Sequence, residues 1–311
     1  MGSLNQAYTR LSMKRRYESW FLRLGLADGT GAWWFRYLLT NPGRKGCSVP
    51  GGAPAQVWAT WFPQDGKPET FIQEFALDQL RVAPDLSPFV IEIGPNRLDD
   101  DTCRGSIEAR GQQISWSLRY HSKFRFTLSN KGWIGFSRTP HSDGIFNGEI
   151  RCGKQLFQGE PLGMGVQGHN CGFRHRKFWT WMHACFPHPD GTISTLEALT
   201  YEMPLGLRFH KAVLWHQNQP HQLRGVQESL RDRQNMRWTF RAASRDCQVA
   251  AEIEGCPNSM HRLPYVKTDC SGTFEVSNDS RAHAKVNLKI ENREEELTTA
   301  DGAVLEMTGD Y

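Results

Sequence analysis

The residues that could carry out chemistry gather in one stretch of the chain, from Gly163 to Met203. Alternate residues of a β-strand point to the same face. Trp179, Trp181 and His183 would therefore share one face of a strand. Farther along, Glu197, Leu199 and Tyr201 would share one face of the next strand. The stretch thus combines a carboxyl group, imidazole rings and indole rings, which are the groups used for proton transfer in an apolar setting.

A turn between these two predicted strands decides which side chains meet. The residues of Pro187–Gly191 are typical of a hairpin. If the hairpin is tight, Glu197 lies within a residue or two of facing Trp181 or His183. Removal from water raises the pKa of a carboxyl group, so Glu197 would stay protonated near neutral pH. We therefore predict Glu197 as an acid, with His169 as its partner. The alternation leaves open that Glu197 faces solvent on an outer barrel face.

The histidines of the stretch allow other interpretations. His169, His175 and His183 are spaced by six and eight residues, which fits no standard set of metal ligands. We therefore predict no metal site. A lone histidine is often a structural residue bonded to the backbone, and this alternative stays open for His169.

The elements that would position these residues are mostly strands. Segments of about 5–9 residues, rich in aromatic and branched side chains, alternate with turns such as Asp28-Gly29 and Asp65-Gly66. Helix signals are scarce, and the best are Leu11–Tyr17 and Gln222–Asn235. After Gly206 a second series of strands begins, in which Ala284–Glu291 alternates between apolar and polar residues. We predict an all-β protein with a boundary near Tyr201–Gly206; a break before His169 is the alternative.

Composition excludes several classes of protein. The formal net charge is +4, from 37 basic and 33 acidic residues without a long basic block, so no nucleic-acid partner is expected. No apolar run is long enough to span a membrane, and the first 16 residues lack the apolar core of a signal peptide. The eight cysteines are scattered without a CxxC pair. We therefore expect free thiols and a cytoplasmic protein.

Aromatic residues are unusually abundant, with 11 Trp and 17 Phe. Large rings can fill the core of a β-sheet. They can also line an apolar pocket. Both uses remain open for any single ring, Trp33 included.

The run His169-Asn170-Cys171-Gly172, followed by Trp179-x-Trp181, resembles the superfamily of carotenoid 1,2-hydratase, AttH-like proteins and tocopherol cyclase. The segments Tyr17–Trp20 and Gly31–Tyr37 are similar to the N-terminal strands of bacterial members. The resemblance covers roughly residues 17–205. It implies two tandem lipocalin-like antiparallel β-barrels, which we place at residues 1–205 and 206–311.

The family's active residues carry over in part. The motif His matches His169, but the motif Trp is Cys171 here, and Gly168 stands where an acidic residue often precedes the His. The family's Tyr-x-Asp strand corresponds to Thr195-Leu196-Glu197, so Glu197 could replace the Asp while the Tyr is missing. These departures put carotenoid hydration itself in doubt.

Three functions are compatible with the sequence. The first is a cofactor-independent enzyme that hydrates, cyclises or isomerises an apolar isoprenoid-like or polyketide-like substrate in a barrel pocket, with Glu197 and His169 as its catalytic residues. The second is a carrier of a lipid or pigment, and the third is an interaction protein with a filled core. The expected partner is an apolar small molecule, and the oligomeric state stays open. We predict that this molecule contacts Trp179, Trp181, His183, Asn170, Tyr201 and Trp33.

Overall fold

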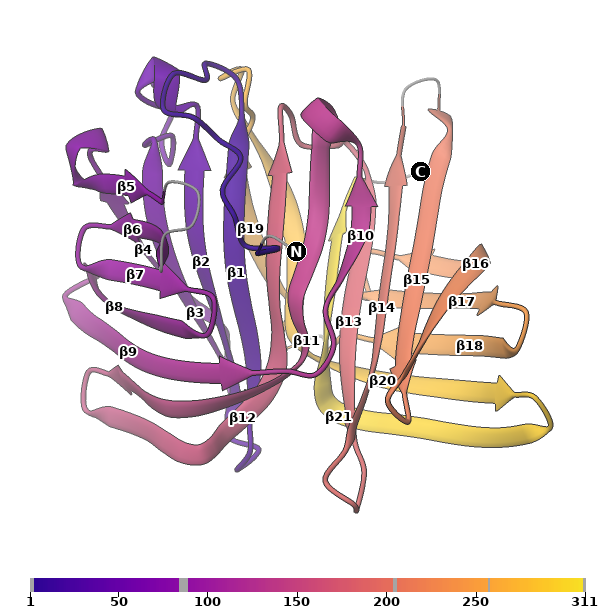
Figure 1. Cartoon of the computed structure of the whole chain (residues 1–311). Helices are drawn as coiled ribbons and strands as arrows, with labels where there is room; N and C mark the ends of the chain where they lie inside the picture. The colour runs from indigo at the N-terminus through magenta and orange to yellow at the C-terminus, as the bar shows by residue number, and fades with distance from the viewer. Residues whose placement is uncertain (1–2, 84–88, 204–205, 257, 310–311) are drawn as a thin grey trace.

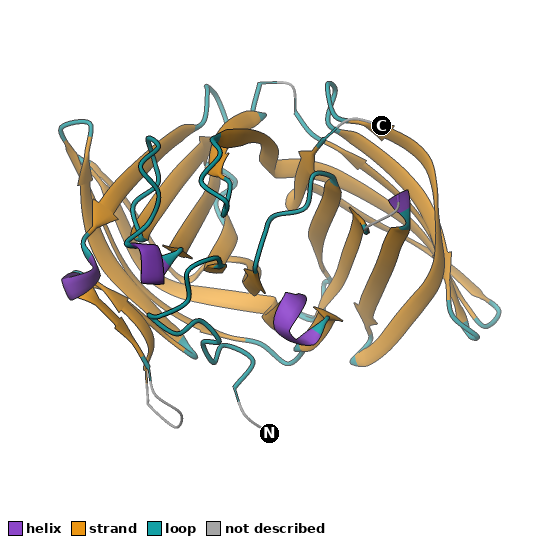
Figure 2. Cartoon of the chain, turned by 90° about the horizontal axis from the view of Figure 1, so that it is seen from above, coloured by secondary structure: helices purple, strands orange, loops and turns teal. Residues whose placement is uncertain are grey.

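A computed structural model describes residues 3–83, 89–203, 206–256 and 258–309. These residues form two antiparallel β-sheets that lie side by side (Figure 1), and each sheet curves around its own core (Figure 2). The helical elements η1 (Pro42–Arg44), η2 (Leu77–Gln79) and η3 (Gly132–Ile134) are short 3-10 turns. The predicted all-β class with two antiparallel barrels is confirmed.

The first sheet has twelve strands, with β4-β3-β2-β1-β12-β11-β9-β8-β7-β6-β5 as its main order and β10 paired to β11. Its strands β1, β2, β10, β11 and β12 contact strands of the second sheet. The strands are β1 (Tyr17–Leu26), β2 (Gly31–Thr40), β3 (Ala55–Pro63), β4 (Glu69–Phe75), β5 (Leu80–Val82), β6 (Phe89–Ile93), β7 (Asn96–Asp99), β8 (Thr102–Ala109), β9 (Gln112–His121), β10 (Phe126–Asn130), β11 (Gly135–Cys152) and β12 (Gln155–Gly172).

The second sheet has nine strands in the order β18-β17-β16-β15-β14-β13-β21-β20-β19. It closes into a barrel because β18 also pairs with β20. The strands are β13 (Trp179–Pro187), β14 (Ile193–Glu202), β15 (Arg208–His216), β16 (Gln219–Asp232), β17 (Arg237–Ala243), β18 (Cys247–Glu254), β19 (His261–Val266), β20 (Thr273–Ile290) and β21 (Arg293–Thr308).

The chain passes from the first sheet to the second between Gly172 and Trp179, earlier than the boundary expected at residue 205. The hairpin of β13 and β14 explains the difference. Its strands pair with β21 and β15, so residues 179–202 belong to the second sheet although they precede the expected boundary. Such pairing between distant segments leaves no local mark in a sequence.

Strand alternation divides the side chains among three apolar clusters. Trp33, Phe35 and Tyr37 point into the first barrel, and Met182, Ala184 and Phe186 point into the second. Residues of opposite parity, such as Trp34 on β2 and Trp181 on β13, form a third cluster shared by both sheets. The outer faces of the two barrels therefore pack against each other through aromatic rings.

A covalent link joins the two barrels. Cys47, in the loop after η1, forms a disulfide with Cys270, in the turn between β19 and β20, with Cα atoms 5.3 Å apart. Next to it the Asn41 side-chain amide donates to the Thr268 carbonyl oxygen at 2.8 Å. The expectation of free thiols is wrong for this pair, because the fold brings together cysteines 223 residues apart.

Two further expectations can be compared with the strands. The helix predicted over Gln222–Asn235 is wrong, because this segment lies mostly in β16, whose polar outer residues mimic the pattern of a solvated helix. The one-sided pattern of Ala284–Glu291 is confirmed: Val286 and Leu288 are buried, whereas Asn287 and Lys289 are exposed. Among the described residues, no helix has the length and apolar character needed to cross a bilayer.

Candidate active site

A cavity of about 150 Å³ lies between the two barrels, and several of the side chains that line it belong to the aromatic cluster that both sheets share. Strands β1, β2, β10, β11 and β12 of the first sheet and β13, β14, β19 and β21 of the second supply its walls. Other lining residues come from the segment that connects the two sheets and from η3. The side chains that line the cavity include Tyr17, Ser19, Phe21, Trp34, Arg36, Lys131, Asn170, Arg174, His175, Arg176, Trp179, Trp181, Tyr201, Tyr265 and Glu306. The expected pocket inside a barrel is thus found between the barrels instead, because large side chains fill each barrel.

Glu306 is the carboxyl group of this cavity. It is half-buried on β21, and its Oε1 accepts a hydrogen bond from Trp179 Nε1 at 2.9 Å. Asn278 Nδ2 lies 3.4 Å from Oε2, and Tyr265 is a third hydrogen-bonding partner. Burial raises the pKa of Glu306 in spite of these donors and of the nearby Arg36 guanidinium. Glu306 can therefore present a proton to a molecule in the cavity.

Several polar atoms of the same wall have no hydrogen-bond partner among the described residues. They are Arg36 Nη1, Asn170 Oδ1 and both ring nitrogens of His175. Buried polar atoms are normally paired, so unpaired ones around a cavity indicate contacts reserved for a ligand or for water. His175 stacks on Tyr17 with ring centroids 3.9 Å apart, and burial lowers the pKa of its imidazole to about 3. The ring is therefore neutral and has a lone pair available to accept a hydrogen bond.

The sequence-predicted site residues divide into two groups. Four of them, Trp179, Trp181, Asn170 and Tyr201, line the cavity. The other four, Glu197, His169, His183 and Trp33, are not among its lining residues. Strand alternation explains the position of Trp33, which points into the first barrel, whereas its neighbour Trp34 faces the cavity.

Glu197 is buried directly behind the cavity wall. It pairs with His183 in the hairpin register, and its Oε1 accepts a hydrogen bond from Trp181 Nε1 at 2.8 Å. The Thr139 hydroxyl donates to Oε2 at 2.8 Å. Burial raises the pKa of Glu197 to about 7, as the sequence suggested. Glu197 thus faces His183, within the range expected from the hairpin, while the catalytic role of Glu197 remains a hypothesis.

His169 binds the N-terminal segment to the first barrel. Its Nδ1 lies 2.8 Å from the Leu4 carbonyl oxygen, and its Nε2 lies 2.8 Å from Glu18 Oε1. The Glu18 carboxylate also accepts hydrogen bonds from the backbone amides of Tyr8 and Thr9. Both ring nitrogens of His169 are thus engaged in the protein interior. This geometry matches the structural alternative that the sequence left open.

His183 is buried between the sheets. Its Nε2 lies 3.4 Å from the Ser142 hydroxyl, and its Nδ1 has no partner among the described residues. Burial, with a smaller effect of Arg23, lowers the pKa of His183 to about 3. The ring is neutral and does not reach the cavity.

Gly168 and Cys171, which differ from the family motif, both lie in tightly packed surroundings. A Cβ atom at residue 168 would lie 2.2 Å from the Phe21 ring, which is itself a cavity wall. An acidic residue there would displace Phe21. Burial raises the pKa of Cys171 to about 12, so its sulfur is a thiol packed near Arg16 and Thr9.

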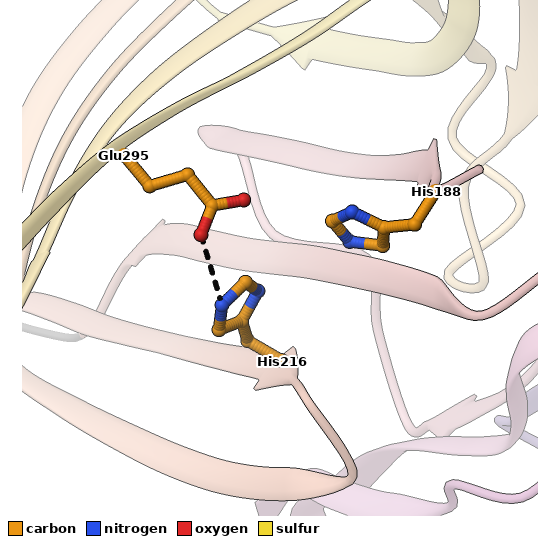
Figure 3. Close-up of side chains that lie close together, drawn as sticks. All are labelled: His188, His216 and Glu295. Atoms are coloured by element: carbon orange, nitrogen blue, oxygen red, sulfur yellow. Dashed lines mark ion pairs between the residues drawn. The ribbon is translucent and has the colours of Figure 1, made fainter. Parts of the chain in front are cut away.

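One group of side chains outside the cavity has metal-binding types. His188, His216 and Glu295 lie near one another at the far end of the second barrel, and Figure 3 shows His216 paired with Glu295. Their ligand atoms all lie within 4.8 Å of one another, and His216 Nε2 lies 3.3 Å from Glu295 Oε2. The Ser194 hydroxyl lies 2.7 Å from His188 Nε2 and 2.8 Å from His216 Nδ1. Ser194 thus links the two imidazole rings in a hydrogen-bonded chain.

The sequence analysis missed Arg36, Glu306 and Tyr265. Arg36 stands alone in the aromatic run Trp33-Trp34-Phe35-Arg36-Tyr37, and Glu306 stands in the apolar strand Val304–Met307. A charged residue inside a strand whose flanking residues are apolar on both faces is a signal of a buried polar site. Tyr265 carries no such signal.

The fold and the cavity define a class of protein in which two β-barrels pack through their outer faces and enclose a cavity between them. Two solved structures share this fold. Kievitone hydratase from Nectria haematococca is 10% identical, with a TM-score of 0.58 over 99% of this chain and 92% of its own. An AttH-like protein from Nitrosomonas europaea is 12% identical, with a TM-score of 0.52 over 97% of this chain and 94% of its own. No protein-family model and no curated protein sequence matches this chain. The resemblance seen in the sequence is thus confirmed at the level of the fold.

Proposed function

We propose that the protein is a hydratase-type enzyme that adds water to a carbon–carbon double bond of an apolar substrate bound between the two barrels. Glu306 is the acid of this proposal. The observation that carries it is the position of Glu306: a carboxyl group with a raised pKa lies in the cavity wall beside unpaired polar atoms. The fold shared with kievitone hydratase supports the proposal.

The reaction needs two proton movements. Glu306 gives its proton to one carbon of the double bond, and the π electrons form the new C–H bond. The neighbouring carbon becomes electron-deficient and is attacked by water. That water loses a proton to the Glu306 carboxylate, so the enzyme is regenerated and the substrate has gained one water molecule. Capture of the cation by another group of the substrate would instead give cyclisation.

The cavity walls suit this intermediate. Trp181, Phe21 and Trp34 present aromatic rings, and the Phe21 and Trp181 rings meet edge to face with centroids 5.3 Å apart. Aromatic faces attract positive charge, an effect worth roughly 0.5–2 kcal/mol per ring. The neutral His175 imidazole can accept a hydrogen bond from the attacking water.

Glu197 is the alternative acid. It is shielded from the cavity, so the Trp181 side chain, which holds its Oε1, would have to move before a substrate could reach it. Glu306 needs no such movement. This difference favours Glu306 and makes the two carboxyl groups separable by experiment.

The test uses the wild type, Glu306→Gln and Glu197→Gln, each incubated with small molecules extracted from the native host by organic solvent. Untargeted mass spectrometry then searches for pairs of compounds that differ by one water. We expect wild type and Glu197→Gln to convert such a pair and Glu306→Gln to lose at least roughly 100-fold in rate, as for a missing general acid.

Loss in Glu197→Gln alone would move the role of acid to Glu197. If no compound changes but one binds equally to all three proteins, the protein is a carrier and the proposal fails.

A further inference from the structure

The charge of the cavity wall is strongly one-sided. Four cationic side chains line it: Arg36, Lys131, Arg174 and Arg176. Glu306 is the only acidic residue among the described residues that line it, and burial raises its pKa. None of the four cations forms an ion pair within the described part of the chain.

Aromatic rings take the place of carboxylates next to these cations. The Arg36 guanidinium lies 4.1 Å from the Tyr265 ring centroid and 5.2 Å from that of Trp58. At the edge of the cavity, Lys131 lies over Phe209 at 4.8 Å, and Arg176 over Tyr201 at 5.4 Å. Such contacts hold a cation in place without neutralising its charge.

Arg36 is the most deeply placed of the four, with 4% of its surface exposed. Its Nε donates to the Ser19 hydroxyl at 2.8 Å, which fixes the plane of the guanidinium, while its Nη1 has no partner. A buried charge without a counter-ion costs several kcal/mol, and proteins normally pair it. The missing partner is best explained by an anion that arrives with the ligand.

We propose that the molecule bound between the barrels is an organic anion, an apolar body with a negatively charged oxygen headgroup that binds Arg36. Lys131, Arg174 and Arg176 attract it to the cavity, and the aromatic wall takes its apolar part. The headgroup chemistry is that of a carboxylate or a phenolate. This proposal deepens the function proposed above, because it names the substrate class of the same cavity, but binding can be measured without turnover.

The test compares two fluorescent probes with the same ring system, 1-anilinonaphthalene-8-sulfonate and the neutral N-phenyl-1-naphthylamine. We expect the wild type to bind the sulfonate at least about tenfold more tightly than the neutral probe. Arg36→Gln should abolish this preference and leave binding of the neutral probe unchanged. The matched control is Arg224→Gln, which removes an exposed arginine of β16 outside the cavity.

Two additional arms complete the test. The double variant Arg174→Gln/Arg176→Gln should slow sulfonate association and weaken its dependence on salt, because these residues act at longer range. Displacement of the sulfonate by 2-naphthoate or by 2-naphthol distinguishes a carboxylate headgroup from a phenolic one.

The proposal is overturned if the wild type shows no preference for the anionic probe, or if Arg36→Gln and Arg224→Gln reduce the preference equally. Probe binding that depends on Arg36, together with an absence of any hydration reaction, would keep this inference and remove the enzymatic one.

Discussion

The indole nitrogen of Trp179 donates a hydrogen bond to Glu306 Oε1 at 2.9 Å, so a ring of the cavity wall also holds the carboxyl group that faces the cavity. A donor to a carboxylate stabilises its charged form and lowers its pKa. The Trp179 indole thus partly opposes the burial that raises the pKa of Glu306. The same side chain therefore contributes to the position of this acid and to its pKa.

Trp179→Phe keeps an aromatic ring but removes the donor. We expect the pKa of Glu306 to rise further, and any pH profile that depends on its protonated form to extend to higher pH. The measurement is a carbon-13 NMR titration of glutamate carboxyl groups, with the Glu306 signal assigned from its loss in Glu306→Gln. Trp34→Phe is the control, because Trp34 lines the cavity without a hydrogen bond to a carboxyl group among the described residues. Equal shifts in both variants would refute the role of the Trp179 donor.

Glu197→Gln should change how stability depends on pH. The pKa of Glu197 is raised from 4.5 to about 7 in the folded protein, so between these pH values the folded state holds more protons than the unfolded state. The wild type therefore loses stability as pH rises from 4.5 to 7, by about 3 kcal/mol at most. Glu197→Gln lacks this loss.

Urea unfolding at a series of pH values measures the difference between the two proteins. The exposed Glu252 of β18 provides the matched control, Glu252→Gln, which should follow the wild type. A difference between wild type and Glu197→Gln that stays constant from pH 4.5 to 7 would show that Glu197 is not buried as a neutral acid.

Local patterns in the sequence were sufficient for part of this site. The period of two along Trp179–His183 and Glu197–Tyr201 predicted the faces of the hairpin, and the pairing of His183 with Glu197 agrees with it. The pattern could not show which face meets the other barrel. That depends on how two whole sheets pack, so Glu197 and Glu306, both on the second sheet, could not be ranked in advance.

The remaining differences arise from long-range pairing. Trp33 and Trp34 are equally aromatic and point to opposite faces of β2, and the sequence does not show which of the two faces meets the cavity. From the sequence, the hairpin of β13 and β14 is assigned to the first barrel. Its strands pair instead with β21 and β15, which come later in the chain. Register and sheet membership are tertiary properties that single strands do not encode.

His169 allows a direct test of structure against sequence resemblance. Its Nε2 lies 2.8 Å from the buried Glu18 Oε1, and breaking a buried pair by removing one partner typically costs about 3–5 kcal/mol. We expect His169→Ala to lose stability by that order and to release the N-terminal segment, while probe binding in the cavity is retained.

Urea unfolding gives the stability of this variant, and hydrogen exchange of residues 3–9 reports on the N-terminal segment. Glu18→Gln should behave in the same way. Unchanged stability with lost turnover would instead support the catalytic role that the resemblance implied for His169.

The disulfide between Cys47 and Cys270 allows a prediction about the whole molecule. It joins the loop after η1 to the turn between β19 and β20, and the Thr268 hydroxyl in that turn donates to the Phe173 carbonyl oxygen at 2.7 Å. Phe173 begins the segment that crosses between the sheets and supplies Arg174, His175 and Arg176 to the cavity. Cys47→Ser should therefore destabilise the protein by about 2–4 kcal/mol and weaken probe binding.

Thiol titration under denaturing, non-reducing conditions checks the premise. Six of the eight cysteines should react, because six are free in the structure. Cys256→Ser is the matched control, since Cys256 is an exposed free thiol and its replacement should change neither stability nor probe binding. Eight reactive thiols, with Cys47→Ser as stable as Cys256→Ser, would show that the two barrels are held together by packing alone.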